Sequence, residues 1–109
     1  MADPHDWVNA KYLQKLKELQ PELFDKFIEL EQAVYRPGSL STKIKELIAV
    51  AVTNVTQCEA CIALHTRNAK LAGASDEEIA EAVFVAIELR AGAGLSHFRP
   101  AARALDTRD

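Results

Sequence analysis

Apolar residues recur every three or four positions along most of the chain, which is the period of an amphipathic helix. This pattern predicts a first helix over 6–19. It predicts a second from Pro21 to about Val34, because proline suits the first position of a helix. An Arg-Pro-Gly-Ser segment at 36–39 follows, and such a segment is typical of a turn. The N-terminal third is therefore expected to be a pair of helices.

The third predicted helix begins at Ser41 or Thr42 and runs to about Asn54. Its residues are apolar on almost every side, which indicates a buried helix. The same Val and Ile run would also suit a strand, but the helical pattern on both sides favours a helix. Thr56 and Glu59 have the T-x-x-E spacing of a capping box, which predicts a helix start immediately before the cysteines.

The fourth predicted helix ends at Gly73, a residue suited to the left-handed position after a helix. A second capping box at 75–78 begins a fifth helix that runs to about Ala91. The Gly-Ala-Gly segment at 92–94 is expected to break or bend it, and a last helix to cover 95–105. No strand precedes those glycines, so a nucleotide-binding loop is excluded. The sequence therefore predicts a single all-α domain over 1–109, a compact bundle of about five to six helices.

The composition excludes several classes of function. Of the 109 residues, 49% are hydrophobic and 27% charged, and the formal net charge is −3. No segment collects Lys and Arg, which argues against a nucleic-acid partner. The longest apolar run, near 47–52, is too short to span a membrane, and the first residues lack the apolar core of a secretory signal. We expect no membrane partner and a cytoplasmic location.

The predicted helices carry more apolar surface than a 109-residue chain can cover. Two of them are apolar on more than one side, and exposed apolar patches of this kind usually mark interfaces. Trp7, Tyr12 and the phenylalanines are expected in the core or at such an interface. We therefore predict a homo-oligomer.

Two cysteines and a histidine lie at spacings that place them together on one helix. With Cys58 taken as zero, Cys61 lies at about −60° and His65 at about −20° around the helix axis. Cys61 and His65 are i, i+4 neighbours, so an imidazole is expected beside a thiol. The start of a helix stabilises a thiolate. In a reducing compartment, cysteines three residues apart are more typical of catalysis or metal binding than of a structural disulfide.

Glu46 precedes Cys58 by twelve residues and begins the buried part of the third helix. A carboxylate in such a place is costly unless a partner compensates its charge. His65 on the next helix is the obvious candidate. An acid, a histidine and a thiol in series match the orienter, base and nucleophile of triad enzymes.

Each of these residues also has a simpler interpretation. Cys58 and Cys61 could be small buried apolar residues, His65 a surface or core residue, and Glu46 a surface acid paired with a nearby lysine. His97 could join Cys58, Cys61 and His65 in a zinc site, although a C-x2-C-x3-H set on one helix is awkward for a tetrahedron. Membership of the last helix is the simpler interpretation of His97.

The combination Glu46-x11-Cys58-x2-Cys61-x3-His65, followed by a glycine helix end and an acidic capping box, resembles the alkylhydroperoxidase D / carboxymuconolactone decarboxylase family. The resemblance covers about residues 36–91. It implies an all-α fold that assembles as a trimer or hexamer, in agreement with the predicted oligomer.

The resemblance also implies an activity. The alkylhydroperoxidase branch keeps both cysteines and reduces peroxides, with a dithiol as reductant and no cofactor or metal. Carried over, Glu46 and His65 would deprotonate Cys61, which a peroxide converts to a sulfenic acid, and Cys58 would close the disulfide. The best-studied form of the motif has a histidine before the second cysteine. Ala60 occupies that position here, which implies a simpler proton network.

Three other functions remain open at this level. One is decarboxylase-like acid–base chemistry on a lactone, which would use Glu46 and His65 without the thiols. The others are a zinc-binding module and an assembly module with vestigial cysteines. The natural peroxide and reductant, and the choice between trimer and hexamer, do not follow from the sequence.

Overall fold

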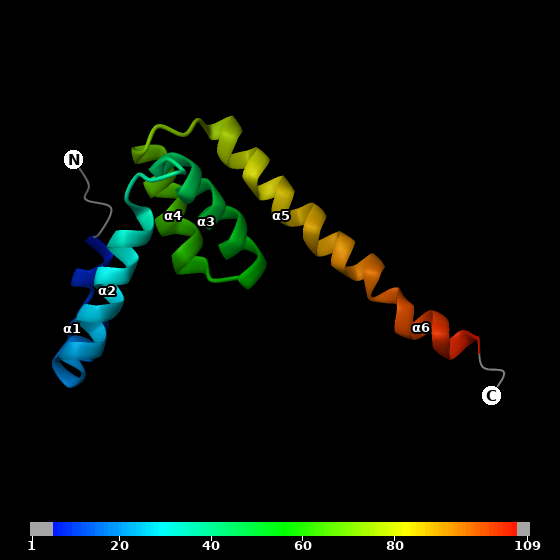
Figure 1. Ribbon diagram of the computed structural model, residues 1–109, viewed down its shortest axis with the longest axis horizontal. Coiled ribbons are helices and arrows are strands. Elements are labelled where there is room, and N and C mark those ends of the chain that lie inside the picture. The colour runs from blue at the N-terminus through cyan, green and yellow to red at the C-terminus, as the bar shows by residue number, and fades with distance from the viewer. Residues whose placement is uncertain (1–5, 107–109) are drawn as a thin grey trace.

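The computed structural model describes residues 6–106, and among these it contains helices and no strand. The all-α class is confirmed, with a short 3-10 helix followed by six α-helices (Figure 1). In chain order they are η1 (Asp6–Asn9), α1 (Lys11–Leu19), α2 (Pro21–Tyr35), α3 (Thr42–Thr56), α4 (Glu59–Leu71), α5 (Asp76–Ser96) and α6 (Phe98–Leu105). No helix in the described part of the chain is long and apolar enough to cross a membrane.

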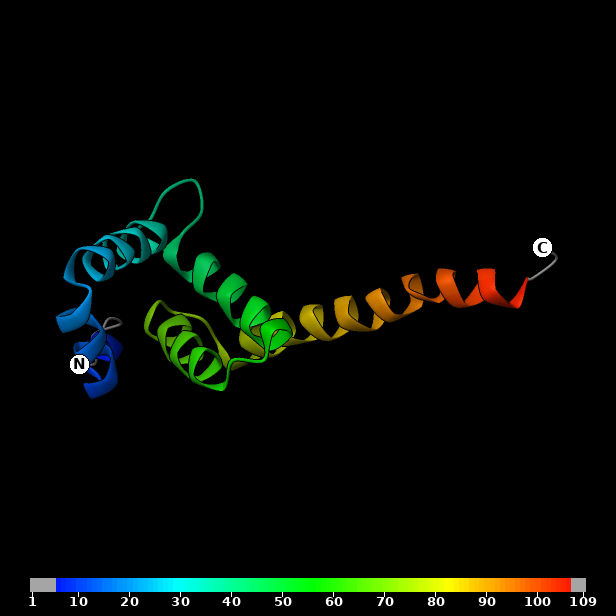
Figure 2. The ribbon, with the colours of Figure 1, turned by 90° about the horizontal axis from the view of Figure 1, so that it is seen from below.

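The single chain is elongated, not the compact bundle expected from the sequence. Its extents are 61 × 38 × 26 Å and its radius of gyration is 18.7 Å, whereas a compact domain of this length has a radius of about 13 Å. Figures 1 and 2 show why. The α1–α2 hairpin extends to one side of the α3–α4 hairpin, and α5 with α6 forms a long arm on the other.

The core lies where α3, α4 and the first half of α5 meet. Val50, Ala69 and Ala74 are buried there. Leu47, Ile79 and Val83 pack against them. Small residues let the helices approach closely, and α3 is the central element because it contacts both α4 and α5. This packing fixes the relative positions of α3 and α4, the two helices that carry the candidate site.

The α1–α2 hairpin forms a separate layer around Phe24, which is its buried residue. Pro21 occupies the first turn of α2, as predicted. The expected helix over 6–19 is interrupted, because Ala10 is extended (φ −57°, ψ 139°) and separates η1 from α1. Gln14 Nε2 donates to Val8 O across this break at 2.7 Å and so connects the two short helices.

Thr56 is not the helix cap that its T-x-x-E spacing predicts. It is the last residue of α3, and its hydroxyl donates back to Thr53 O at 3.3 Å. Gln57 then adopts a left-handed conformation (φ 61°) that ends α3. The first helical residue after it is Glu59, with Cys58 as the N-cap. The expected helix start is therefore present, but the residue that caps it is a cysteine.

The second capping box forms as predicted. Ser75 accepts from the amide of Glu78, whose carboxylate accepts from the Ser75 amide in return. Lys43 on α3 also bonds Glu78 at 2.8 Å, and this bond, with that from Ser75, holds the pKa of the exposed Glu78 carboxyl below its usual range. Gly73 has the expected positive φ of 99° after α4. These contacts set the direction in which α5 begins.

The Gly-Ala-Gly segment does not break α5, which continues to Ser96. Glycine costs about 1 kcal/mol in a helix but does not block one, and neither Gly92 nor Gly94 has a positive φ. The interruption comes from Pro100, which lacks an amide hydrogen and whose ring conflicts with the carbonyl four residues earlier. That carbonyl belongs to Ser96, the last residue of α5. The final helix is correspondingly shorter than the predicted 95–105.

Candidate active site

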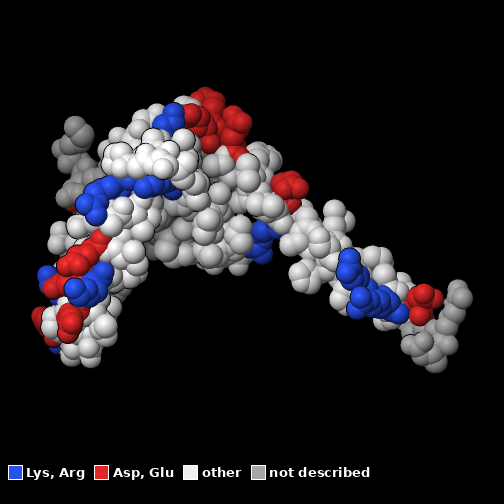
Figure 3. Space-filling view, viewed as in Figure 1, with Lys and Arg blue, Asp and Glu red and all other residues white. Residues whose placement is uncertain are grey.

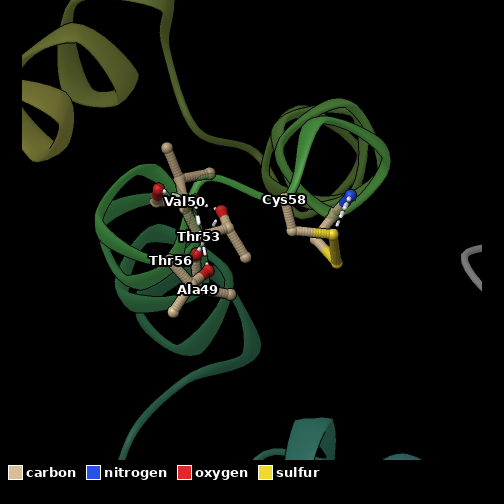
Figure 4. Close-up of a disulfide and its surroundings, with 6 residues drawn as sticks. Ala49, Val50, Thr53, Thr56 and Cys58 are labelled. Carbon is tan, nitrogen blue, oxygen red and sulfur yellow. Dashed lines mark hydrogen bonds between the residues drawn. A yellow bond between two sulfur atoms is a disulfide. The ribbon is translucent and has the colours of Figure 1, made fainter.

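Cys58 and Cys61 form a disulfide at the start of α4, with their Cα atoms 5.2 Å apart. The backbone amide of Cys61 donates to Cys58 Sγ at 3.3 Å, so the sulfur accepts one of the amides that a helix start leaves unpaired. Figure 4 shows this bond beside the last turns of α3, where the Thr53 hydroxyl bonds the carbonyls of Ala49 and Val50. The two sulfurs thus lie on the same side of the helix start and can exchange between thiol and disulfide.

Glu46 and His65 are joined between α3 and α4. His65 Nδ1 lies 2.7 Å from Glu46 Oε1. Glu46 is 3% exposed, although it carries a carboxylate. An ionised carboxylate only accepts hydrogen bonds, so Nδ1 carries the proton and Nε2 is left as the basic nitrogen. The structure therefore brings together the acid and the imidazole that the sequence placed nineteen residues apart.

Tyr35 is a neighbour of this pair that the sequence analysis did not identify. The ring of Tyr35, the last residue of α2, stacks on the His65 imidazole with centroids 5.3 Å apart and planes at 28°. Burial, and then the negative charges of Glu46 and Glu31, raise the pKa of the Tyr35 hydroxyl. The hydroxyl therefore keeps its proton to a higher pH than that of an exposed tyrosine. No sequence motif marks Tyr35, because it comes from a helix outside the segment that carries the cysteines.

A cavity of about 510 Å³ lies over the disulfide and reaches His65. The cysteines, Ala60 and His65 form its α4 side. Its other walls come from the N-terminal helices and are mostly apolar. They include Trp7, Tyr12, Leu13, Phe27, Leu30 and Val34. Three of these residues, expected in the core or at an interface, thus contribute to the cavity: Trp7, Tyr12 and Phe27. The arrangement could admit an apolar molecule to the sulfurs while Glu46 remains behind the imidazole.

His97 lies apart from these residues. It follows α5 on the distal arm, where its Nδ1 bonds Ala93 O at 2.8 Å. No group of three or more His, Cys, Asp or Glu residues suited to a metal ion occurs within 6–106. The zinc interpretation that combined His97 with the cysteines and His65 therefore has no geometric support from the described residues.

Comparison with known proteins places this helical fold and its CxxC pair in an established family. The model of the carboxymuconolactone decarboxylase family matches residues 21–104, so the chain belongs to that family. The family belongs to the alkylhydroperoxidase D-like superfamily, as the resemblance implied. The match includes all four candidate residues and Tyr35.

Individual relatives support this assignment. The chain is 46% identical over 85 residues to "Uncharacterized protein 4 in cox locus" of Paracoccus denitrificans. This match covers 78% of this chain and 77% of that protein. A crystal structure of a Methanobacterium thermoautotrophicum protein superposes with a TM-score of 0.71 at 34% identity, covering 84% of this chain and 98% of the other.

A further solved structure is that of a relative with a suggested redox role. It is a carboxymuconolactone decarboxylase family protein from Thermotoga maritima, for which a role in the antioxidative response has been suggested. It is 37% identical to this chain, with a TM-score of 0.55, and the match covers 73% of this chain and 93% of that protein.

Proposed function

We propose that this protein is a thiol-dependent peroxidase in which Cys58 and Cys61 cycle between dithiol and disulfide, with Glu46 and His65 as the proton relay. The observation that carries this proposal is the hydrogen bond between the buried Glu46 on α3 and His65 on α4. The cysteine pair lies at the start of that same α4 helix. The antioxidative role suggested for the Thermotoga maritima relative is consistent with it.

The proposed cycle balances in three steps. First, the Cys61 thiolate attacks the terminal peroxide oxygen, the O–O bond breaks, and the products are Cys61 sulfenic acid and, after protonation, an alcohol. Second, the Cys58 thiol attacks that sulfur, which releases water and forms the disulfide. Third, an external dithiol reduces the disulfide and is itself oxidised to a disulfide. The net reaction converts one peroxide and one dithiol into an alcohol, water and the oxidised dithiol.

In the proposed relay, Glu46 orients the imidazole and His65 transfers the protons. Glu46 holds the imidazole with Nδ1 protonated, so Nε2 can take the thiol proton of Cys61, four residues earlier on α4. The same imidazolium then returns a proton to the leaving alkoxide. Since Ala60 supplies no second imidazole, this relay uses His65 alone. The proposed catalytic residues are therefore Glu46, Cys58, Cys61 and His65.

A thiol titration with single-cysteine variants tests the cycle. In the reduced wild type, one equivalent of cumene hydroperoxide should remove two thiols per chain, and a dithiol should restore both. Cys58→Ser should stop at a trapped sulfenic acid on Cys61, visible by mass spectrometry. Cys61→Ser should lose peroxide turnover altogether. Full turnover in Cys61→Ser would contradict the proposal, and a sulfenic acid only on Cys58 would reverse the order of the two cysteines.

The same variants discriminate the acid–base alternative. If Glu46 and His65 instead decarboxylate a lactone, activity on a carboxymuconolactone should survive in Cys58→Ser/Cys61→Ser. Loss of all measurable activity in this double variant, together with peroxide turnover in the wild type, supports the thiol mechanism.

We also propose that the functional form is a homo-oligomer, in which a second copy covers the apolar surface of the α5–α6 arm. Within residues 6–106, the arm leaves seven large apolar side chains half exposed or more: Phe84, Val85, Ile87, Leu89, Leu95, Phe98 and Leu105. Together with the elongated shape, this surface fits a self-complementary partner. Light scattering should give a multiple of 12.0 kDa, and a monomer at micromolar concentration would contradict this proposal.

A further inference from the structure

We infer that Tyr35 is a positioning residue for the His65 imidazole, holding the ring by its face while Glu46 holds it by its edge. The inference rests on the proposed peroxidase function for its kinetic test, but its structural test is independent of that function. The stacked contact, with centroids 5.3 Å apart, lies within the 4.5–7 Å range of favourable aromatic pairs.

Glu46 alone leaves one freedom in the imidazole. A single hydrogen bond at Nδ1 fixes the tautomer and, together with the Cβ–Cγ bond, one edge of the ring, but the ring plane can still rotate about that edge. A flat aromatic surface against the imidazole face removes this rotation. Because Nε2 is the nitrogen that must reach the thiol, the ring plane decides whether the proton transfer is aligned.

Tyr35 is itself held by contacts between α2 and α3. Its carbonyl accepts a 2.7 Å hydrogen bond from the Thr42 hydroxyl in the first turn of α3. The next carbonyl, that of Arg36, accepts from Lys45 Nζ at 2.6 Å. Thr42 lies one helical turn before Glu46, so the segment that fixes Tyr35 also carries the acid. Both contacts of the imidazole, with the Tyr35 ring and with the Glu46 carboxylate, are thus positioned by α3.

The position of Tyr35 also connects the site to the cavity. Tyr35 lines the 510 Å³ cavity together with His65, and α2 supplies much of the apolar wall there. A shift of α2 would therefore move both the cavity wall and the surface on which the imidazole rests. The phenol is neutral at physiological pH even at its usual pKa, and burial and the Glu46 charge raise that pKa further, so it adds no competing anion to the relay.

Two substitutions separate the ring from the hydroxyl. Tyr35→Phe keeps the aromatic face, whereas Tyr35→Leu removes it. We expect reduced Tyr35→Leu to react with cumene hydroperoxide about 2- to 10-fold more slowly than the wild type, and Tyr35→Phe to stay within about twofold of it. Equal losses in both variants would overturn the inference, because the hydroxyl and not the ring would then be the acting group.

Nuclear magnetic resonance gives a readout that needs no activity. The chain has three histidines, so the His65 ring protons can be assigned with a His65→Gln variant. In the wild type they should show the ring-current shift of an overlying aromatic. This shift should persist in Tyr35→Phe and disappear in Tyr35→Leu. Tyr12→Leu is the matched control, because Tyr12 lines the same cavity without stacking on the imidazole, and the shift should persist there.

The wild type also provides a measurement that does not depend on whether a variant folds. Nuclear Overhauser contacts between the rings of Tyr35 and His65 are expected, and their absence would overturn the inference. If those contacts are present but the reduced wild type does not consume peroxide, the peroxidase proposal fails while the placement of Tyr35 stands. An unchanged His65 spectrum in a folded Tyr35→Leu variant would count against Tyr35 alone.

Discussion

The α3–α4 hairpin and the α5–α6 arm use their apolar residues in opposite ways. The hairpin buries small side chains, such as Ala49, Val50 and Ala69, and encloses the Glu46 carboxylate among them. The arm displays large ones, with Leu95 80% exposed, and Figure 3 shows acidic side chains gathered near its beginning. The candidate site is therefore built by contacts within one chain, whereas the described part of the arm leaves large apolar side chains exposed.

Contacts along α5 show where this helix stops packing against the core and becomes an exposed arm. Ile79, Val83 and Ala86 recur at helical spacing, the first two pack against the core, and Ala86 is buried. Arg90 then donates to Val55 O at 3.0 Å and satisfies one of the last carbonyls of α3. Beyond Arg90, α5 continues away from the hairpin (Figure 1). Contact between α3 and α5 thus extends along α5 as far as Arg90 at least.

The largest expected effect is at the buried acid of the hairpin. Glu46→Gln removes the negative charge that stabilises the His65 imidazolium, and its amide can donate to Nδ1 as well as accept from it, so the tautomer is no longer fixed. We therefore expect the rate of peroxide reduction to fall by about 100-fold or more. Glu77→Gln, an exposed acid in the first turn of α5, is the matched control and should stay near the wild-type rate. Equal rates for the two variants would remove Glu46 from the relay.

A pair of valines compares the two regions directly. Val50 is fully buried in the hairpin, whereas Val85 on α5 is 55% exposed. Val50→Ala should lower the free energy of unfolding by about 2 kcal/mol, through lost burial and a residual cavity. Val85→Ala should cost less than about 0.5 kcal/mol at high dilution. Denaturant unfolding at several protein concentrations measures both.

The proposed oligomer sharpens the valine comparison further. If a second copy covers the arm, the cost of Val85→Ala should grow with protein concentration, because assembly stabilises the folded chain by mass action. The cost of Val50→Ala should not change in the same way. Equal costs for both variants at every concentration would mean that the two regions do not differ in the manner described.

A smaller difference in stability is expected between the two predicted capping boxes, one that begins at Thr56 and one that begins at Ser75. Ser75→Ala removes a cap that accepts the Glu78 amide at 3.0 Å, so it should lower the free energy of unfolding by about 1 kcal/mol. Thr56→Ala removes only a 3.3 Å bond back to Thr53 O and should cost less than about 0.5 kcal/mol. Thermal unfolding of the two variants checks the order, and a larger cost for Thr56→Ala would contradict it.

The smallest effect is a change of stability at alkaline pH. Burial, Glu46 and Glu31 raise the pKa of Tyr35 above its usual 10.0. Above about pH 10 the unfolded chain therefore loses this proton before the folded chain does, so the free energy of unfolding falls as the pH rises from there through the raised pKa. Below that pH the contribution is constant. In Tyr35→Phe this component should be absent, which denaturant midpoints at about pH 8 and about pH 10.5 can compare.

The local signals in the sequence predicted the helices where a single residue type enforces the conformation. Gly73 ends α4 with a positive φ, and Ser75 caps α5. They failed where two local choices compete. Thr56 bonds its own helix and leaves the cap to Cys58, and the glycines of α5 remain helical while Pro100 makes the interruption. A capping or breaking residue has only a preference, and the neighbouring turns decide whether it is used.

By itself the sequence determined the all-α class and the spacing that puts Cys61 and His65 four residues apart on α4, with Cys58 just before it, because helical periodicity is a property of the chain's local pattern. It also made Glu46 the candidate partner of His65, since a buried carboxylate needs one. Only the tertiary structure decided that Tyr35 stacks on that imidazole, that α1 and α2 wall the cavity, and that α5 leaves the core beyond Arg90. Those contacts join segments distant along the chain, and packing between helices, which has no period in the sequence, sets them.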